Sequence, residues 1–163
     1  MRKKIRPVWL WLLFLTLFLG LIFQSFPVKA QEQEELRLYS QSAVLMDGLS
    51  GRILYGKNAE QIRPMASTTK IMTCLLAIEN GQTDEWVSAS SYAASQPKVR
   101  MVVRKGEQYR LKDLLYGLML ESYNDAAVMI AEFIGGTREG FAAMINVKAR
   151  ELGCKDTWFI TPN

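Results

Sequence analysis

The chain has 163 residues, enough for one domain at most, and it contains no histidine. Its 20 lysines and arginines exceed its 16 aspartates and glutamates, which gives a formal net charge of +4. Five of the basic residues and none of the acidic ones fall within positions 1–30, so the rest of the chain is close to neutral. This distribution excludes the basic surface typical of nucleic-acid binding. The absence of histidine excludes Ser-His-Asp and Cys-His sites and disfavours a transition-metal site, so we expect no cofactor and no metal.

Residues 1–30 are typical of a secretory signal sequence. Basic residues up to Arg6 precede an uncharged apolar run over 8–23, and the small residue Ala30 ends the stretch. We predict cleavage after Ala30 and export of 31–163. An uncleaved segment, and membrane association through it, stays open as the alternative, although the run is shorter than the roughly 20 residues that usually span a bilayer.

The first elements after the signal are predicted to be a hairpin and a helix. Residues 43–46 and 52–55 are apolar except for Arg52 and flank a turn that contains two glycines, which predicts two antiparallel strands. A helix is predicted to begin at Ser67 and to end at Asn80, because Gly81 is a usual helix stop.

The second half of the chain alternates between strand-like and helix-like periodicity. We expect, in order, a half-buried strand over 98–104, a helix over 111–120, a buried helix over 125–134, a helix from Arg138 with Thr137 as its N-cap, and a strand over 158–160.

Ser67 and Lys70 are a candidate catalytic pair. Three residues apart at the start of a helix, their side chains share one face. Serine is a weak nucleophile, and a desolvated lysine with a lowered pKa can accept its proton. Serine is also an ordinary N-cap residue, so the two residues alone leave a purely structural interpretation open.

A second polar stretch, 121–124, separates two predicted helices and places Ser122 and Asn124 at the start of the buried one. A structural interpretation is again open, with Asn124 as N-cap and Asp125 in the first helical turn.

The two cysteines, Cys74 and Cys154, are too few for a disulfide framework and lack metal-ligand spacing. Cys74 suits a core position, and one disulfide between the two stays open.

With their flanks, both polar stretches closely resemble those of the low-molecular-mass penicillin-binding proteins, the serine D-alanyl-D-alanine carboxypeptidases. Ser67-x-x-Lys70 stands within Pro-Met-Ala-Ser-Thr-Thr-Lys-Ile-Met-Thr, and Ser122-x-Asn124 within Leu-Leu-Tyr-Gly-Leu-Met-Leu-Glu-Ser-Tyr-Asn-Asp-Ala-Ala. The resemblance covers nearly all of 31–163 and corresponds to the N-terminal portion of the family's catalytic domain. It implies an α+β fold of the DD-peptidase/β-lactamase type, with helices packed on an antiparallel sheet, incomplete at the C-terminus.

The resemblance also implies roles for these residues. Ser67 would attack the carbonyl of the penultimate D-alanine of a peptidoglycan stem peptide and Lys70 would accept its proton. Ser122 would relay a proton to the leaving amine, and Asn124 would bind substrate or Lys70. We therefore expect an exported hydrolase whose partners are stem peptides ending in D-Ala-D-Ala and β-lactam antibiotics.

The chain departs from the family pattern at two points. Tyr123 stands where glycine is more common, and the third motif, Lys-Thr/Ser-Gly, does not occur. That motif would supply an oxyanion donor, whose loss can cost on the order of 2.7 to 4 kcal/mol of transition-state stabilisation. We expect a truncated enzyme with weak or no activity, and poor solubility from an unpaired sheet edge.

Two other functions stay open. One is a serine β-lactamase-like hydrolase, although no Glu-x-x-Leu-Asn stretch follows Ser122. The other is an exported remnant that keeps the helices without catalysis.

Overall fold

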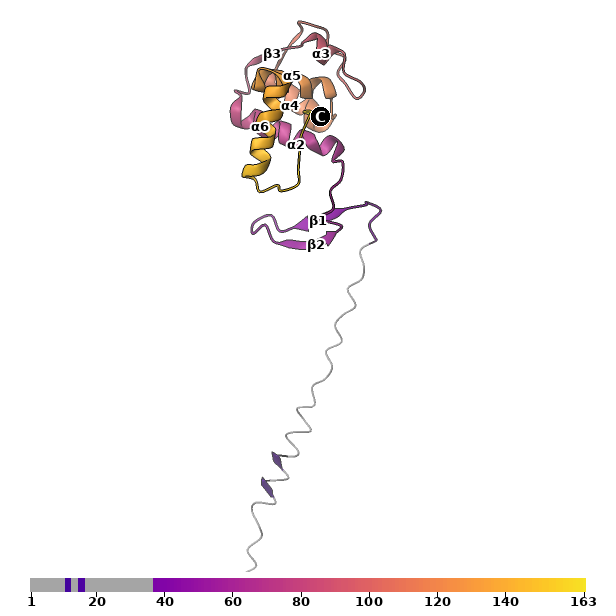
Figure 1. Cartoon of the computed structure of the whole chain (residues 1–163), viewed down its shortest axis with the longest axis vertical. Helices are drawn as coiled ribbons and strands as arrows, with labels where there is room; N and C mark the ends of the chain where they lie inside the picture. Colours follow the sequence, from indigo (N-terminus) through magenta and orange to yellow (C-terminus); the bar gives the residue numbers. More distant parts are fainter. Residues whose placement is uncertain (1–10, 13–14, 17–36) are drawn as a thin grey trace, which may run out of the picture. The chain divides into compact units, whose positions relative to one another are not determined.

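A computed structural model of the chain describes residues 11–12, 15–16 and 37–163. The predicted signal sequence and its cleavage site lie outside the described residues, apart from positions 11–12 and 15–16. The chain divides into two compact units, 1–59 and 60–163 (Figure 1). Among the described helices, none is both long enough and apolar enough to cross a bilayer.

The described part of the first unit is built on a hairpin. Strand β1 (Ala43–Met46) pairs antiparallel with β2 (Ile53–Lys57), as the sequence predicts. In the turn, the carboxylate of Asp47 accepts a hydrogen bond from the Ser50 N–H at 2.8 Å, and Gly51 has a φ of +70°. Glycine takes this left-handed conformation without steric cost, which explains its position in the turn.

The second unit consists mainly of helices. They are η1 (Ala66–Thr68), α2 (Thr69–Asn80), α3 (Ser91–Ala94), α4 (Leu111–Leu120), α5 (Asn124–Gly135) and α6 (Arg138–Glu151). Two short strands, β3 (Trp86–Ser88) and β4 (Gln108–Arg110), pair antiparallel, although the sequence analysis predicted neither. Together with the hairpin, they give the α+β composition expected from the sequence.

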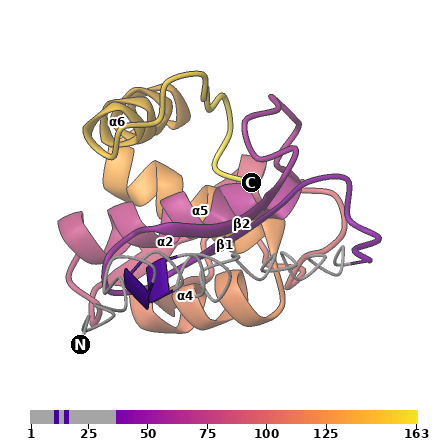
Figure 2. The same ribbon diagram turned by 90° about the horizontal axis from the view of Figure 1, so that it is seen from below.

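Helix α5 is central to this unit. Its residues 125–131 are all buried, and it packs against α2, α3, α4 and α6. Figure 2 shows α6 nearly end-on, whereas α2 and α4 run across the view. The prediction of a buried helix here is confirmed, because a helix that is apolar on nearly every side needs neighbours all round.

Glycine allows helices to approach closely at the end of α2. A Cβ on Gly81 would lie 2.6 Å from Leu111 Cδ2 and 2.9 Å from Ile134 Cδ1. The predicted helix end is confirmed, but Gly81 is extended, with a φ of −114°. Close packing, not a left-handed turn, therefore favours glycine at this position.

The strand predicted over 98–104 is wrong. This segment contains no strand, and three consecutive backbone N–H groups within it are bound by one side chain instead of by a neighbouring strand. Met101, Val102 and Val103 donate to the carboxylate of Asp125 at 3.0, 2.9 and 3.4 Å. One buried carboxylate thus replaces the neighbouring strand that the alternating pattern suggested.

The strand predicted over 158–160 is also wrong, for a similar reason. The buried side chain of Asn146 donates to the Phe159 carbonyl at 2.7 Å and accepts from the Phe159 N–H at 2.9 Å. An asparagine amide offers one donor and one acceptor, so it satisfies an extended backbone as a second strand would.

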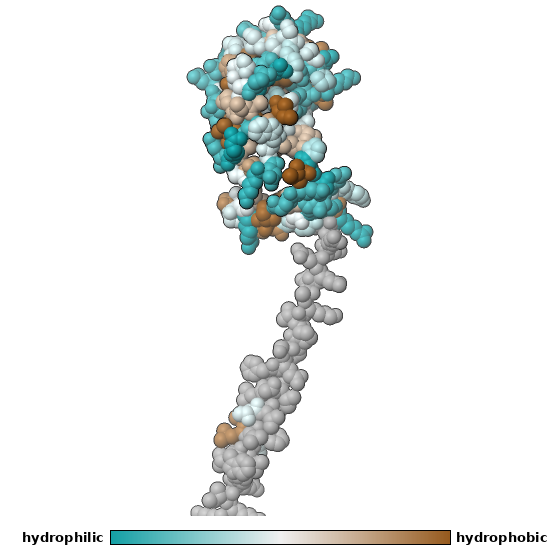
Figure 3. Space-filling model, viewed as in Figure 1, coloured by the Kyte–Doolittle hydropathy of each residue, from teal (hydrophilic) through white to brown (hydrophobic). Residues whose placement is uncertain are grey.

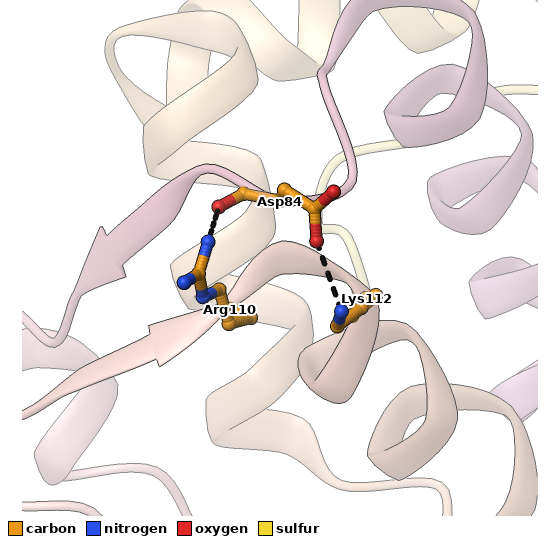
Figure 4. A network of polar contacts seen from close by, with 3 residues as sticks. All are labelled: Asp84, Arg110 and Lys112. Carbon is orange, nitrogen blue, oxygen red and sulfur yellow. Dashed lines mark hydrogen bonds and ion pairs between the residues drawn. The ribbon is translucent and has the colours of Figure 1, made fainter.

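Surface polar contacts join the loop before β3 to the end of β4 and the start of α4. In Figure 4 the carboxylate of Asp84 accepts from Lys112 Nζ at 2.9 Å, and the Asp84 carbonyl accepts from Arg110. The hydrogen bond to Lys112 lowers the pKa of Asp84. Exposed ion pairs of this kind add little to stability. Figure 3 shows apolar side chains on the visible face as separate patches between polar ones.

Candidate active site

Ser67 lies in η1, immediately before α2, and its side chain is exposed. The N-cap residues of η1 and α2 are Met65 and Thr68, and neither helix has a side-chain cap hydrogen bond. The interpretation of Ser67 as an N-cap is therefore wrong. Ala66 has a φ of +46°, an uncommon conformation for a residue with a Cβ, directly before the serine. Uncommon backbone geometry of this kind is concentrated at functional sites.

Lys70 brings the two predicted motifs together. Its side chain lies in the first turn of α2, and the residue is only 3% exposed. Its Nζ lies 3.4 Å from Ser67 Oγ, 3.1 Å from Ser122 Oγ and 2.8 Å from Asn124 Oδ1. Burial lowers the pKa of Lys70, because an ammonium loses hydration in the interior. A lysine of this kind is easier to deprotonate than an exposed one.

Ser122 lies in the short loop between α4 and α5 and has a φ of +59°. Asn124 is the first residue of α5, whose N-cap is Tyr123, so the interpretation of Asn124 as a cap is wrong. Its amide group has polar partners on both sides. Nδ2 donates to the carbonyls of Pro97 and Lys98 at 3.3 and 3.2 Å, while Oδ1 accepts from the lysine amine.

Tyr123, the departure from the more common glycine, packs against α4. A Cβ on Gly117 would lie 3.0 Å from Tyr123 Cδ2 and 3.3 Å from Met101 Sδ. The N–H of Tyr123 also donates to the Gly117 carbonyl at 3.2 Å. The ring therefore lies over the backbone of α4, and the change from glycine leaves Ser122 and Asn124 beside the amine.

The structure thus brings all four predicted residues, Ser67, Lys70, Ser122 and Asn124, to one place. A cavity of about 620 Å³, lined by α6 and 158–163 among others, includes none of the four. In the described part of the chain, no group of three histidine, cysteine or acidic side chains is arranged to hold a metal ion. The cysteine pairing left open by the sequence is not formed, since Cys74 and Cys154 are free thiols. Chemically, the arrangement offers an exposed hydroxyl beside a buried amine.

One residue of this region was missed as a site residue by the sequence analysis. The sequence indicates Asp125 only as an acid in the first helical turn, yet it is wholly buried and its carboxylate binds the segment that also contacts Asn124. The sequence signal was an acidic residue at the head of a largely apolar helix.

The sequence comparisons give one family. Residues 28–163 match the family described as D-alanyl-D-alanine carboxypeptidase. The chain is 37% identical over 158 residues to D-alanyl-D-alanine carboxypeptidase DacF of Bacillus subtilis, covering 90% of this chain and 41% of that protein. It is 32% identical over 154 residues to a D-alanyl-D-alanine endopeptidase of Pseudomonas aeruginosa, covering 90% and 50%. The chain therefore spans half or less of the length of these relatives.

The solved structures that resemble this chain indicate the same family. D-alanyl-D-alanine carboxypeptidase DacD of Francisella tularensis matches with a TM-score of 0.73 at 33% identity, covering 78% of this chain and 32% of that one. Penicillin binding protein 5 of Haemophilus influenzae matches with a TM-score of 0.70 at 33% identity, covering 76% and 38%. These likenesses confirm the expected DD-peptidase type of α+β fold. On sequence and fold together, the chain belongs to the family of serine D-alanyl-D-alanine carboxypeptidases.

Proposed function

We propose that the chain acts on peptidoglycan stem peptides ending in D-Ala-D-Ala through an acyl-enzyme formed on Ser67. The observation that supports this most strongly is the position of Lys70 Nζ, 3.4 Å from the Ser67 hydroxyl and 3.1 Å from that of Ser122. A buried amine with a lowered pKa beside an exposed hydroxyl is the arrangement that a serine nucleophile needs when no histidine is present.

In the proposed acylation, Lys70 is neutral and accepts the hydroxyl proton of Ser67 as its oxygen attacks the carbonyl carbon of the penultimate D-alanine. The C–N bond to the terminal D-alanine then breaks. The leaving amine takes a proton through Ser122, whose hydroxyl contacts the same lysine amine. The products are an ester on Ser67 and free D-alanine, so atoms and protons balance. Water hydrolyses the ester to complete the cycle.

The other residues support this step. The Asn124 amide holds the lysine amine at 2.8 Å, so the base is oriented before substrate arrives. The backbone N–H of Ser67 supplies one donor to the oxyanion. The Lys-Thr/Ser-Gly motif that would supply the second donor does not occur in the 163 residues, so we propose that turnover by these residues is slow.

The proposal extends to partners and location. β-Lactams contain an acyl carbonyl that the same serine can attack, so penicillin is expected to remain attached to Ser67. The basic and apolar stretches of residues 1–30 favour an extracytoplasmic site of action, where stem peptides are found.

Release of D-alanine tests the proposal. The purified chain is incubated with a peptide ending in D-Ala-D-Ala, beside Ser67→Ala and the control Ser50→Ala, whose exposed hydroxyl lies in the hairpin turn. We expect slow release by the wild type and by Ser50→Ala, and none by Ser67→Ala. Release that survives in Ser67→Ala would refute the role of this serine. Rapid hydrolysis of penicillin instead of D-alanine release would favour the β-lactamase alternative.

A further inference from the structure

Asp125 has an unusual set of partners for a buried acid. It is 0% exposed in the first turn of α5. Its Oδ1 accepts from the N–H groups of Met101 and Ala126, both at 3.0 Å. Its Oδ2 accepts from Val102 at 2.9 Å and from Val103 at 3.4 Å. Three of these four donors belong to a segment more than 20 residues away in the sequence. Burying such a polar group is costly unless it is hydrogen-bonded, so these backbone contacts determine where the segment lies.

The neighbouring residue, Asn124, binds the same segment from its other end. Its backbone N–H donates to the Val99 carbonyl at 2.8 Å, and its Nδ2 donates to the carbonyls of Pro97 and Lys98. Two consecutive residues of α5 therefore hold segment 97–103, one through its carbonyls and the other through its N–H groups.

The segment needs such support because its backbone is strained. Val102 has a φ of +68°, and a β-branched residue rarely adopts this left-handed conformation. Its side chain is exposed, so packing supplies little compensation. The hydrogen bond from its N–H to Asp125 is the contact that favours the observed conformation.

The orientation of Asn124 connects this segment to the base. An amide can rotate by half a turn and exchange its oxygen and nitrogen. Because the carbonyls of Pro97 and Lys98 accept from Nδ2, the oxygen faces Lys70 Nζ. If the two carbonyls move, Nδ2 loses both of its described acceptors, and the contact with Lys70 Nζ alone remains to orient the amide.

We propose that Asp125 is a positioning residue for the Lys70 amine, acting through segment 97–103 and the amide of Asn124. It touches neither substrate nor the reacting atoms. The inference rests on the proposed function, because it concerns the orientation of the proposed base. We therefore expect a substitution of Asp125 to alter the titration of Lys70 only when Asn124 is present.

The experiment uses the full chain with Asp125→Asn, Asn124→Ala and the double variant. Asp125→Asn keeps the size of the side chain but places an NH₂ group against backbone donors. The control is Thr137→Ala, which removes the N-cap of α6 and weakens folding away from the lysine. The titration of Lys70 is followed by carbon NMR of its side chain, and the rate of acylation at saturating penicillin is measured alongside.

We expect Asn124→Ala to lower the pKa of Lys70, because it removes an oxygen that stabilises the ammonium form. Asp125→Asn should also lower the pKa of Lys70, and the double variant should lower this pKa no further than Asn124→Ala does. Thr137→Ala should leave it unchanged. Acylation should slow about ten- to a hundredfold in Asp125→Asn, the range for a misplaced catalytic group. A Lys70 pKa that does not change in folded Asp125→Asn, or effects that add in the double variant, would overturn the proposal.

Two results separate this inference from the proposed function. If the wild type is not acylated at all, the proposed function is refuted. The titration of Lys70 in the Asp125 and Asn124 variants then still tests the positioning role of Asp125. If Asp125→Asn does not fold, amide hydrogen exchange of the wild type decides: the N–H groups of residues 101–103 should exchange slowly, and rapid exchange would refute the hydrogen bonds on which the inference depends.

Discussion

At the scale of single residues, the central feature is a lysine amine held in the interior by three polar neighbours. Lys70 is 3% exposed, and burial lowers its pKa. The folded state is therefore destabilised when the lysine is charged, because the buried ammonium loses hydration. This destabilisation disappears once the amine is neutral. The same burial that disfavours the ammonium makes the amine a better proton acceptor.

Replacing Lys70 separates its contribution to the rate of acylation from its effect on the free energy of unfolding. We expect Lys70→Met to slow acylation by about 10² to 10⁴-fold, the usual contribution of a general base. The free energy of unfolding at neutral pH should be unchanged or higher, because the cost of burying a cation is removed. Penicillin acylation kinetics and urea unfolding measure the two quantities. Acylation at the wild-type rate would refute the role of the amine.

The pH dependence of stability gives an independent test of the lowered pKa. Between that pKa and the unfolded value near 10.5, the unfolded state binds more protons than the folded state. The free energy of unfolding of the wild type should therefore rise with pH through this window, relative to Lys70→Met. Urea unfolding from pH 7 upward measures the difference. A difference that is constant with pH would contradict a depressed lysine pKa.

Ser122 is expected to matter for rate more than for folding. Ser122→Ala removes one neighbour of the lysine amine and the proposed proton relay, and we expect acylation to slow about a hundredfold, the lower end for proton-transfer catalysis. Circular dichroism should show an intact fold. An unchanged acylation rate would assign the proton relay to another group, such as water.

The sequence allowed these four side chains to be identified but not their distances. The spacing of Ser67 and Lys70 follows from helix geometry alone. Ser122 lies 52 residues and Asn124 54 residues beyond Lys70, so their contacts depend on tertiary packing. The capping interpretations were wrong because side-chain hydrogen bonds to Lys70 and to loop carbonyls replaced the bonds of a helix cap.

At the scale of elements, the packing of helices against one another positions the site. Helices α2 and α5 carry Lys70 and Asn124, and α5 also packs against α6. Periodicity predicted these helices well, because each buries an apolar stripe or is buried all round. It failed for 98–104 and 158–160, where an aspartate and an asparagine side chain satisfy the extended backbone. Sequence patterns do not show which distant side chain takes that place.

The junction of α5 and α6 leaves no space for a methyl group at Gly135. A Cβ there would meet the backbone nitrogen of Phe141 and lie 2.7 Å from its Cα. Backbone cannot rotate away as a side chain can, so Gly135→Ala should reduce the free energy of unfolding by about 2 to 3 kcal/mol, as overpacking does. The control Gly48→Ala, which has nothing within 4 Å of its Cβ, should change it by less than about 0.5 kcal/mol. Urea unfolding compares them, and equal effects would refute the close contact.

At the scale of the whole molecule, the chain carries the proposed nucleophile and base, and it covers half or less of each compared member of its family. It covers 41% of the Bacillus subtilis relative and 32% of the Francisella tularensis structure. Exposed apolar side chains, among them Trp158 and Ile160 at 69% and 76% exposure, are consistent with the poor solubility predicted from the sequence. Sedimentation velocity of the purified chain tests that prediction, and a monodisperse monomer at high concentration would contradict it.

The proposed function depends on a covalent acyl-enzyme that Ser67 forms after activation by Lys70. Intact-mass spectrometry of residues 31–163, with and without penicillin and beside Ser67→Ala, tests it most directly once circular dichroism has shown that each sample is folded. We expect a mass gain equal to one penicillin in the wild type and none in Ser67→Ala. No gain in a folded wild-type sample, or a gain that persists without Ser67, would contradict it.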